Sequence, residues 1–252
     1  MKIQYCSDLH LEFPENKKYI EKHFVQPAGE ILLLAGDILP LNLDPRHYPF
    51  FKFIADNFEA VYWIPGNHEY YGSDIGKSND PIHEKIYSNV FLVNNKTIDH
   101  NNVSIICSTM WSYIRPENEL ILQKSLADFS SIYFNGRPFL PFQFNQLHQA
   151  SLAFIKSEAG KQATSKNIVL THHVPTFYNY PTKYKKSVLS DGFAVELHDY
   201  INDSNIDYWI YGHHHYNTPS FTIGNTELIT NQLGYVKQRE YKYYKKDAVF
   251  EI

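Results

Sequence analysis

Seven side chains of the types that bind divalent metal ions lie in five short clusters along the chain. They are Asp8, His10, Asp37, Asn67, His172, His213 and His215. Two carboxylates, one amide and four imidazoles form the mixed oxygen and nitrogen set expected for two first-row divalent ions, rather than for a structural zinc site built of thiolates. A carboxylate has two oxygens, so Asp37 could bridge two cations about 3.5–4 Å apart. The pattern therefore predicts a two-metal site.

The spacing within two of the clusters would place the metal-binding side chains on one side of the backbone. Asp8 and His10 are two residues apart, so both point the same way if the segment is extended. The same argument puts His213 and His215 on one face. Gly36 precedes Asp37, and a glycine there lets the backbone turn sharply off a strand.

Each cluster alone has a second interpretation. An Asp-x-His triplet is common at surfaces and caps, Asp37 could cap a turn or a helix, and Asn67 could belong to a tight loop. The remaining histidines of the two histidine runs, His173 and His214, are expected to be packed or hydrogen-bonded and to point away from the site. The metal-site interpretation rests on all five clusters together.

An apolar, strand-like run comes directly before every cluster. The runs are residues 3–6, 31–35, 60–64, 168–170 and 206–211. Ligands collect at the carboxyl ends of strands in an open parallel sheet. The strands would therefore deliver all five clusters to one edge.

The rest of the chain alternates strands and helices, which is typical of a layered α/β sandwich. Helices are expected over residues 16–23, 48–58, 145–158 and 194–202. Further strands are expected over 86–93 and 103–109, and short strands of a second sheet over 220–223, 227–230 and 248–252. Two irregular segments, 112–142 and 174–191, are expected to be functional rims or disordered excursions.

Length and composition describe one α/β domain over residues 1–252, with 43% hydrophobic and 20% charged residues. The apolar stretches are shorter than a membrane-spanning helix requires, and a metal-type residue already stands at position 8, so we expect neither a membrane span nor a cleavable signal peptide. The two cysteines lie in apolar runs, which favours a reducing cytoplasm. A net charge of −4 argues against broad electrostatic binding to nucleic acid.

The clusters carry a family resemblance that extends over essentially the whole chain. Five motifs resemble, in order, those of the calcineurin-like metallophosphoesterase superfamily: Asp8-x-His10, Gly36-Asp37, Gly66-Asn67-His68-Glu69, His172-His173-x-Pro175 and Gly212-His213-x-His215. The resemblance implies a four-layer α/β/β/α sandwich, in which two mixed sheets are flanked by helices.

The resemblance also implies a ligand set and a reaction. One divalent ion would be held by Asp8, His10, Asp37 and His215, and the other by Asp37, Asn67, His172 and His213. The ions would be manganese, iron or zinc. A hydroxide bridging them would attack phosphorus in line, and His68 would stabilise the transition state or protonate the leaving alkoxide.

Departures from subfamily patterns narrow the expected function. Gly36-Asp37 continues as Ile38-Leu39-Pro40, which matches neither the Asp-Arg-Gly of protein phosphatases nor the tyrosine ligand of purple acid phosphatases. His68 stands where the lipid A pathway pyrophosphatases usually have arginine. The remaining pattern resembles small phosphodiesterases, including those that act on cyclic nucleotides. We therefore expect a two-metal hydrolase of small phosphodiesters or phosphomonoesters, with the diester favoured. A nuclease of the same superfamily and a non-catalytic scaffold that retains the fold are the alternatives.

Three residues are candidate contacts for a small phosphoester substrate. Arg115 and Arg137 lie in the first irregular segment and could clamp a phosphate. Tyr71 could stack against a nucleobase. Solvated surface arginines and aromatic loop packing would explain the same residues.

Overall fold

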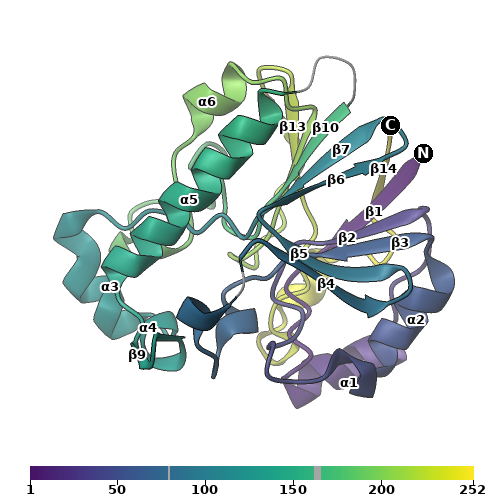
Figure 1. Ribbon diagram of the computed structural model, residues 1–252, viewed down its shortest axis with the longest axis horizontal. Coiled ribbons are helices and arrows are strands. Elements are labelled where there is room, and N and C mark those ends of the chain that lie inside the picture. The colour runs from purple at the N-terminus through teal and green to yellow at the C-terminus, as the bar shows by residue number, and fades with distance from the viewer. Residues whose placement is uncertain (79, 162–165) are drawn as a thin grey trace.

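Two β-sheets lie face to face, and helices cover their outer faces (Figure 1). The structure is a computed structural model that describes residues 1–78, 80–161 and 166–252. Helices α1 (Pro14–Lys22) and α2 (Pro49–Asn57) cover one sheet, and α5 (Pro141–Ala159) and α6 (His198–Asn202) cover the other. This arrangement confirms the predicted α/β fold of two mixed sheets flanked by helices. No helix of the described residues is long and apolar enough to cross a membrane.

The first sheet has six strands, of which the four central ones are parallel. Its order is β14 (Val249–Glu251), β1 (Lys2–Cys6), β2 (Ile31–Leu34), β3 (Ala60–Trp63), β5 (Val90–Asn94) and β4 (Ile82–Tyr87). The two edge strands, β14 and β4, run antiparallel to their neighbours. The carboxyl ends of β1, β2 and β3 therefore lie side by side.

The second sheet repeats this plan. Its order is β12 (Phe221–Ile223), β13 (Thr226–Thr230), β11 (Tyr208–Tyr211), β10 (Lys166–Leu170), β7 (Val103–Cys107) and β6 (Lys96–His100). The central strands β13, β11, β10 and β7 are parallel, and β12 and β6 are antiparallel edges. Two sets of carboxyl ends meet where the sheets converge.

The apolar runs of the sequence are continuous because the central strands are buried on both faces. In β2, Ile31 and Leu33 point toward the second sheet, whereas Leu32 and Leu34 join the core beneath α1 and α2. All four side chains are fully buried. Strand alternation thus supplies both the inter-sheet core and one helix-facing core.

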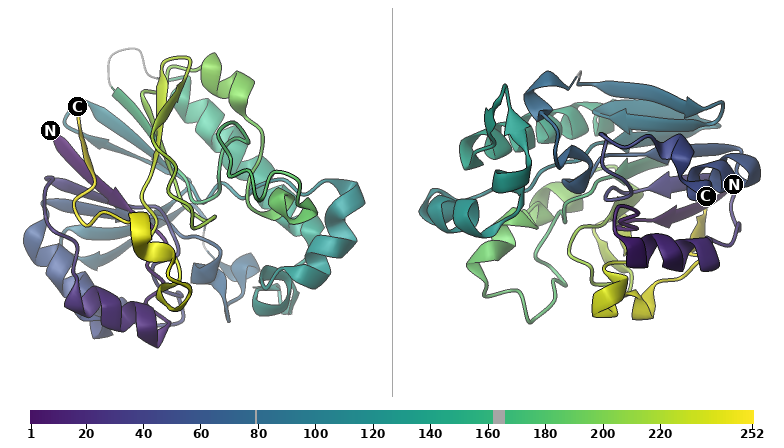
Figure 2. Two further views of the ribbon diagram at one scale, coloured as in Figure 1. Left: turned by 180° about the vertical axis from the view of Figure 1, so that it is seen from behind. Right: turned by 90° about the horizontal axis from the view of Figure 1, so that it is seen from below.

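Three predicted elements differ in the structure. Residues 86–93 do not form one strand: the chain turns at Ser88 and Asn89, so β4 and β5 pair as a hairpin. Residues 248–252 were expected in the second sheet, but β14 pairs with β1 of the first and so brings the two chain ends together (Figures 1 and 2). The helix predicted over 194–202 begins only at His198, because the preceding backbone instead pairs with Val174 and Pro175.

The segment 112–142, predicted to be irregular, contains regular structure. It holds α3 (Glu119–Ser125), α4 (Asp128–Ser131) and the short hairpin of β8 (Tyr133–Phe134) and β9 (Arg137–Pro138). Its apolar side chains, including Ile114, Leu122 and Phe129, form a separate core with Trp111 and Phe144. This segment, called the α3–α4 segment below, extends beyond the sheets as a wall (Figure 1).

Candidate metal centre

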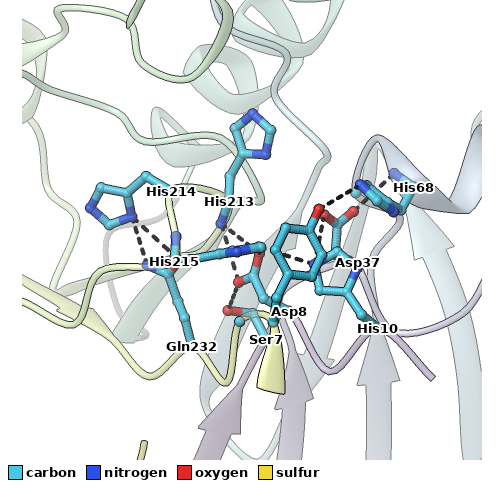
Figure 3. Close-up of polar contacts among 12 residues, drawn as sticks. Ser7, Asp8, His10, Asp37, His68, His213, His214, His215 and Gln232 are labelled. Atoms are coloured by element: carbon cyan, nitrogen blue, oxygen red, sulfur yellow. Dashed lines mark hydrogen bonds and ion pairs between the residues drawn. The ribbon is translucent and has the colours of Figure 1, made fainter. Parts of the chain in front are cut away.

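The structure brings all seven predicted metal-binding residues together at the converging carboxyl ends of the two sheets. Figure 3 shows five of them, which are Asp8, His10, Asp37, His213 and His215. Asp8 and His10 follow β1, Asp37 follows β2, and Asn67 follows β3. From the second sheet, His172 follows β10, and His213 and His215 follow β11. The sheets are joined here, since Nδ1 of His172 lies 2.8 Å from the carbonyl oxygen of Ala35.

The spacing argument assumed an extended backbone at these residues, but the structure has turns there instead. Five of them have left-handed φ values: Asp8 (56°), His10 (48°), Asp37 (55°), His213 (78°) and His215 (50°). Such values are uncommon outside glycine, although Asp and His are among the residues that tolerate them best. Backbone hydrogen bonds hold the turns, including one from the amide of His10 to the carbonyl of Asp37 at 2.9 Å. Strained backbone of this kind clusters at functional sites.

One group of ligand atoms comprises Asp8, His10, Asp37 and His215, whose candidate donor atoms all lie within 4.8 Å of one another. Nε2 of His215 lies 3.0 Å from Nε2 of His10 and 3.3 Å from Oδ1 of Asp8. Nε2 of His10 lies 3.6 Å from Oδ2 of Asp37. These are the four residues that the family resemblance assigns to one ion.

A second group is centred on Nε2 of His172. This nitrogen lies 3.4 Å from Oδ1 of Asp37, 3.1 Å from Nδ1 of His213 and 3.2 Å from Oδ1 of Asn67. Asp37 thus presents one carboxylate oxygen to each group. That is the position of a bridging ligand between two cations.

The protonation pattern of the four histidines fits cation binding. Each turns its other ring nitrogen outward to an oxygen that can only accept a hydrogen bond. The pairs are His10 with Glu12, His215 with Glu240, His172 with the carbonyl of Ala35, and His213 with the carbonyl of Gly192. The outward nitrogen therefore carries the proton, and the inward nitrogen presents a lone pair. Inward lone pairs this close together repel unless a cation lies between them.

Electrostatics keep the two carboxylates of the centre ionised. Burial would raise the pKa of Asp37, but the neighbouring His172 and other imidazoles hold that pKa well below its ordinary value. Burial would likewise raise the pKa of Asp8, but the neighbouring His215 lowers it. The centre is an anionic site with polarised imidazoles, as divalent cations require.

Glu69 supports the loops of the centre from beneath. Its side chain is fully buried and accepts hydrogen bonds from the backbone amides of Asp37, Ile38 and Gly66 and from the indole of Trp63. Burial and the nearby charge of Asp37 raise the pKa of Glu69 to about 7. Its place in the Gly66-Asn67-His68-Glu69 motif was the sequence signal, but its role follows only from these contacts.

His68 lies at the edge of the centre rather than within either ligand group. Its Nδ1 donates to Glu12 over 2.9 Å, and its ring stacks on Tyr71 with centroids 4.2 Å apart. Nε2 is left 3.4 Å from the hydroxyl of Tyr235. His68 lines the cavity described next, so Nε2 is the atom available to a bound molecule.

A cavity of about 610 Å³ opens over the centre, and Asp37, Asn67, His68, His213 and His215 lie in its floor. Its walls come mainly from the α3–α4 segment and from residues 180–193. Six aromatic residues line it: Phe13, Tyr71, Tyr180, Tyr184, Phe193 and Tyr235. Among the described residues that line it, none is lysine or arginine, whereas Asp128 and Glu240 are acidic.

The predicted substrate contacts separate in the structure. Tyr71 lines the cavity. Arg115 instead pairs with Asp191, with Nε and Nη2 each 3.0 Å from a carboxylate oxygen, and Arg137 lies exposed in β9. Neither arginine lines the cavity.

The two histidines expected outside the site are buried nearby. His214 contacts the side chain of Gln232 (Figure 3), and His173 packs against Trp111 and Phe144. Neither belongs to the two ligand groups described above.

Sequence reasoning missed three carboxylates that touch this centre. Glu12 contacts His10 and His68, Glu240 contacts His215, and Asp128 contacts Asn67. Only Glu12 stood close to a motif, two residues after His10.

Comparisons with known proteins agree with this geometry. A family model described as calcineurin-like phosphoesterase matches residues 1–217. An uncharacterised protein, L509, of Acanthamoeba polyphaga mimivirus is 29% identical over 262 residues, an alignment that covers 94% of this chain and 92% of the viral protein. The crystal structure of phosphopantetheinyl hydrolase from Mycobacterium tuberculosis has a TM-score of 0.70 at 14% identity, and the match covers 100% of this chain and 95% of that one. At that identity the likeness concerns the fold.

Proposed function

Because the chain belongs to the calcineurin-like phosphoesterase family, we propose that it hydrolyses small phosphodiesters with two divalent metal ions. Bound ions of this kind lower the pKa of water and neutralise charge on phosphoryl oxygens. The two ligand groups that share Asp37 support the pairing of the ions. Manganese, iron and zinc all suit the donor set.

The absence of lysine and arginine from the described cavity lining is the observation that favours a diester. Two divalent ions carry four positive charges, and Asp8 and Asp37 offset two of them. An attacking hydroxide and a diester monoanion would offset the other two. A monoester dianion would leave one negative charge without a partner, beside Asp128 and Glu240, and uncompensated charge in such a cavity is costly.

The aromatic walls support a substrate with apolar or planar arms. Tyr71, Tyr180 and Phe193 are among the six aromatic residues that line the cavity. Pockets of this composition bind ligands through apolar contact and use a few polar groups to fix orientation. The structural neighbour from Mycobacterium tuberculosis is named a phosphopantetheinyl hydrolase, a name that is consistent with a substrate of this kind in that protein.

His68 is placed to act on the leaving group. Glu12 holds its Nδ1, so the proton that could pass to a departing alkoxide is at Nε2, which is the ring nitrogen left for the cavity. Proton transfer of this type contributes about 10²- to 10⁴-fold to rate. The stacked Tyr71 ring fixes the plane in which His68 can work.

Hydrolysis of two aryl esters tests the proposal. The manganese-loaded protein should hydrolyse bis-p-nitrophenyl phosphate with a higher kcat/KM than p-nitrophenyl phosphate. Asp37→Ala should abolish both activities, because Asp37 serves both ligand groups. Asp56→Ala, which removes an exposed carboxylate on α2, is the matched control and should behave like the wild type. Preference for the monoester, or turnover by Asp37→Ala, would overturn the proposal.

A further inference from the structure

Asp128 reaches the metal centre from outside both sheets. It is the first residue of α4 in the α3–α4 segment, and its side chain is 3% exposed. Its Oδ1 accepts a hydrogen bond from Nδ2 of Asn67 at 2.8 Å and another from the hydroxyl of Tyr71 at 2.7 Å. The predicted metal ligands all follow strands of the two sheets. Asp128 connects the α3–α4 segment to one of them, Asn67.

The contact decides which end of the Asn67 amide faces the centre. Oδ1 of Asn67 lies 3.2 Å from Nε2 of His172, and Nδ2 points to Asp128. The two ends of an amide have nearly the same shape, but only the oxygen can bind a cation. An ionised carboxylate only accepts hydrogen bonds, so it holds the NH₂ group and turns the oxygen inward.

The same carboxylate fixes the surroundings of His68. The hydroxyl of Tyr71 donates to Asp128, and the ring of Tyr71 stacks on His68 at 4.2 Å with an interplanar angle of 27°. A tyrosine held at its hydroxyl has little freedom to rotate away from the ring that it covers. Asp128 therefore contacts the predicted metal ligand Asn67 directly. It acts on the predicted general acid, His68, only through the ring of Tyr71.

We propose that Asp128 is a positioning residue that fixes the Asn67 amide as an oxygen ligand of the second cation and aligns His68 through Tyr71. The inference rests on the proposed function, because it requires that Asn67 binds a metal ion. Groups that orient metal ligands in this way typically contribute 10- to 100-fold to metal affinity or activity. None of the five sequence motifs contains Asp128.

Three substitutions distinguish loss of the hydrogen-bond acceptor at residue 128 from a general loss of folded structure. Asp128→Ala removes the acceptor. Asp128→Asn removes the charge, but its carbonyl oxygen can still accept from both Asn67 and Tyr71. Asp128→Leu has a similar branched shape without an acceptor, and it replaces Asp128→Ala if that variant fails to fold. Thermal unfolding of the metal-free proteins establishes that each variant is folded.

The test is a manganese titration followed by electron paramagnetic resonance, which distinguishes a single Mn²⁺ from a spin-coupled pair. Asp128→Ala should bind the first ion as the wild type does, and its affinity for the second should fall about 10- to 100-fold. Asp128→Asn should restore the coupled signal. Wild-type affinity for both ions in folded Asp128→Ala or Asp128→Leu would overturn the inference, as would an equal defect in Asp128→Asn.

The titration also separates this inference from the proposed function. If the wild type binds fewer than two ions, the proposed function fails, and the role of Asp128 fails with it. If the wild type binds two ions and hydrolyses the diester while Asp128→Ala does the same, only the role of Asp128 is refuted.

Discussion

The carboxylate of Glu12 lies 2.9 Å from Nδ1 of His68. The same Oε1 atom lies 3.1 Å from Nδ1 of His10, and the side chain of Glu12 is largely buried. One acceptor thus orients a predicted metal ligand and the predicted general acid. The metal centre and the proton donor therefore form one hydrogen-bonded unit. Substitutions within this unit should affect metal binding and turnover to different extents, depending on the residue that is changed.

His68→Ala should lower turnover and leave the metals in place. His68 supplies no atom to the two groups that share Asp37, and it lines the cavity. We expect kcat for bis-p-nitrophenyl phosphate to fall about 10²- to 10⁴-fold. Metal content, measured by mass spectrometry on the same sample, should match the wild type. Loss of bound metal from this variant would place His68 among the ligands.

Glu12→Gln should impair both functions of the unit. An amide oxygen accepts from an imidazole more weakly than a carboxylate does, so His10 and His68 lose their fixed orientation. Metal affinity and kcat should each fall about 10- to 100-fold. Calorimetric titration with Mn²⁺ and steady-state kinetics measure the two effects. Glu15→Gln, in the first turn of α1, is the matched control, and an equal loss there would refute the assignment.

The pairing of Arg115 with Asp191 should stabilise the cavity wall in a pH-dependent way. Burial would raise the pKa of Asp191, but hydrogen bonds from Arg115 and Asn118 lower it below 3.8. A carboxylate with a depressed folded-state pKa stabilises the protein above its unfolded-state pKa, and this stabilisation is lost as the pH falls through the folded-state value. The free energy of unfolding of Asp191→Asn should therefore be about 1–3 kcal/mol lower than that of the wild type at pH 7.

The measurement is urea unfolding of the metal-free proteins at a series of pH values. The difference between wild type and Asp191→Asn should be constant near neutrality and shrink as the pH falls below 3.8. A difference that does not depend on pH would show that the charge of Asp191 contributes nothing.

Metal binding should raise the melting temperature of the wild type but not of Asp37→Ala. Ligands that bind only the folded state stabilise it by mass action, by about 2.7 kcal/mol per site at 100 times Kd. For a domain of this size that corresponds to about 5–10 °C per site. Scanning calorimetry with and without Mn²⁺ measures the shift. An equal shift in Asp37→Ala would locate the stabilising ions elsewhere.

The sequence predicted the layers and the location of the site because both depend on local patterns. Continuous apolar runs such as residues 31–35 mark strands that are buried on both faces. Polar residues directly after such strands, such as Asp37 and His172, had to meet where the sheets converge. The outcome did not depend on the extended geometry assumed at Asp8, which adopts a left-handed turn instead.

What could not be predicted depends on contacts between residues far apart in the chain. Asp128 is 61 residues from Asn67, and the segment that carries it has no strand or motif pattern that points to the site. Arg115 was a reasonable phosphate ligand by residue type. Its partner Asp191 lies 76 residues away in the sequence. The residues around Arg115 give no sign that its guanidinium is hydrogen-bonded to this carboxylate.

The central claim is that two metal ions at this centre carry out the hydrolysis, and the most direct test is to count ions against turnover. Metal-free protein is titrated with Mn²⁺, and bound metal and hydrolysis of bis-p-nitrophenyl phosphate are measured at each step. Turnover should rise with the second equivalent and reach its plateau at two ions per chain. Full turnover with one ion, or none with two bound, would contradict the account.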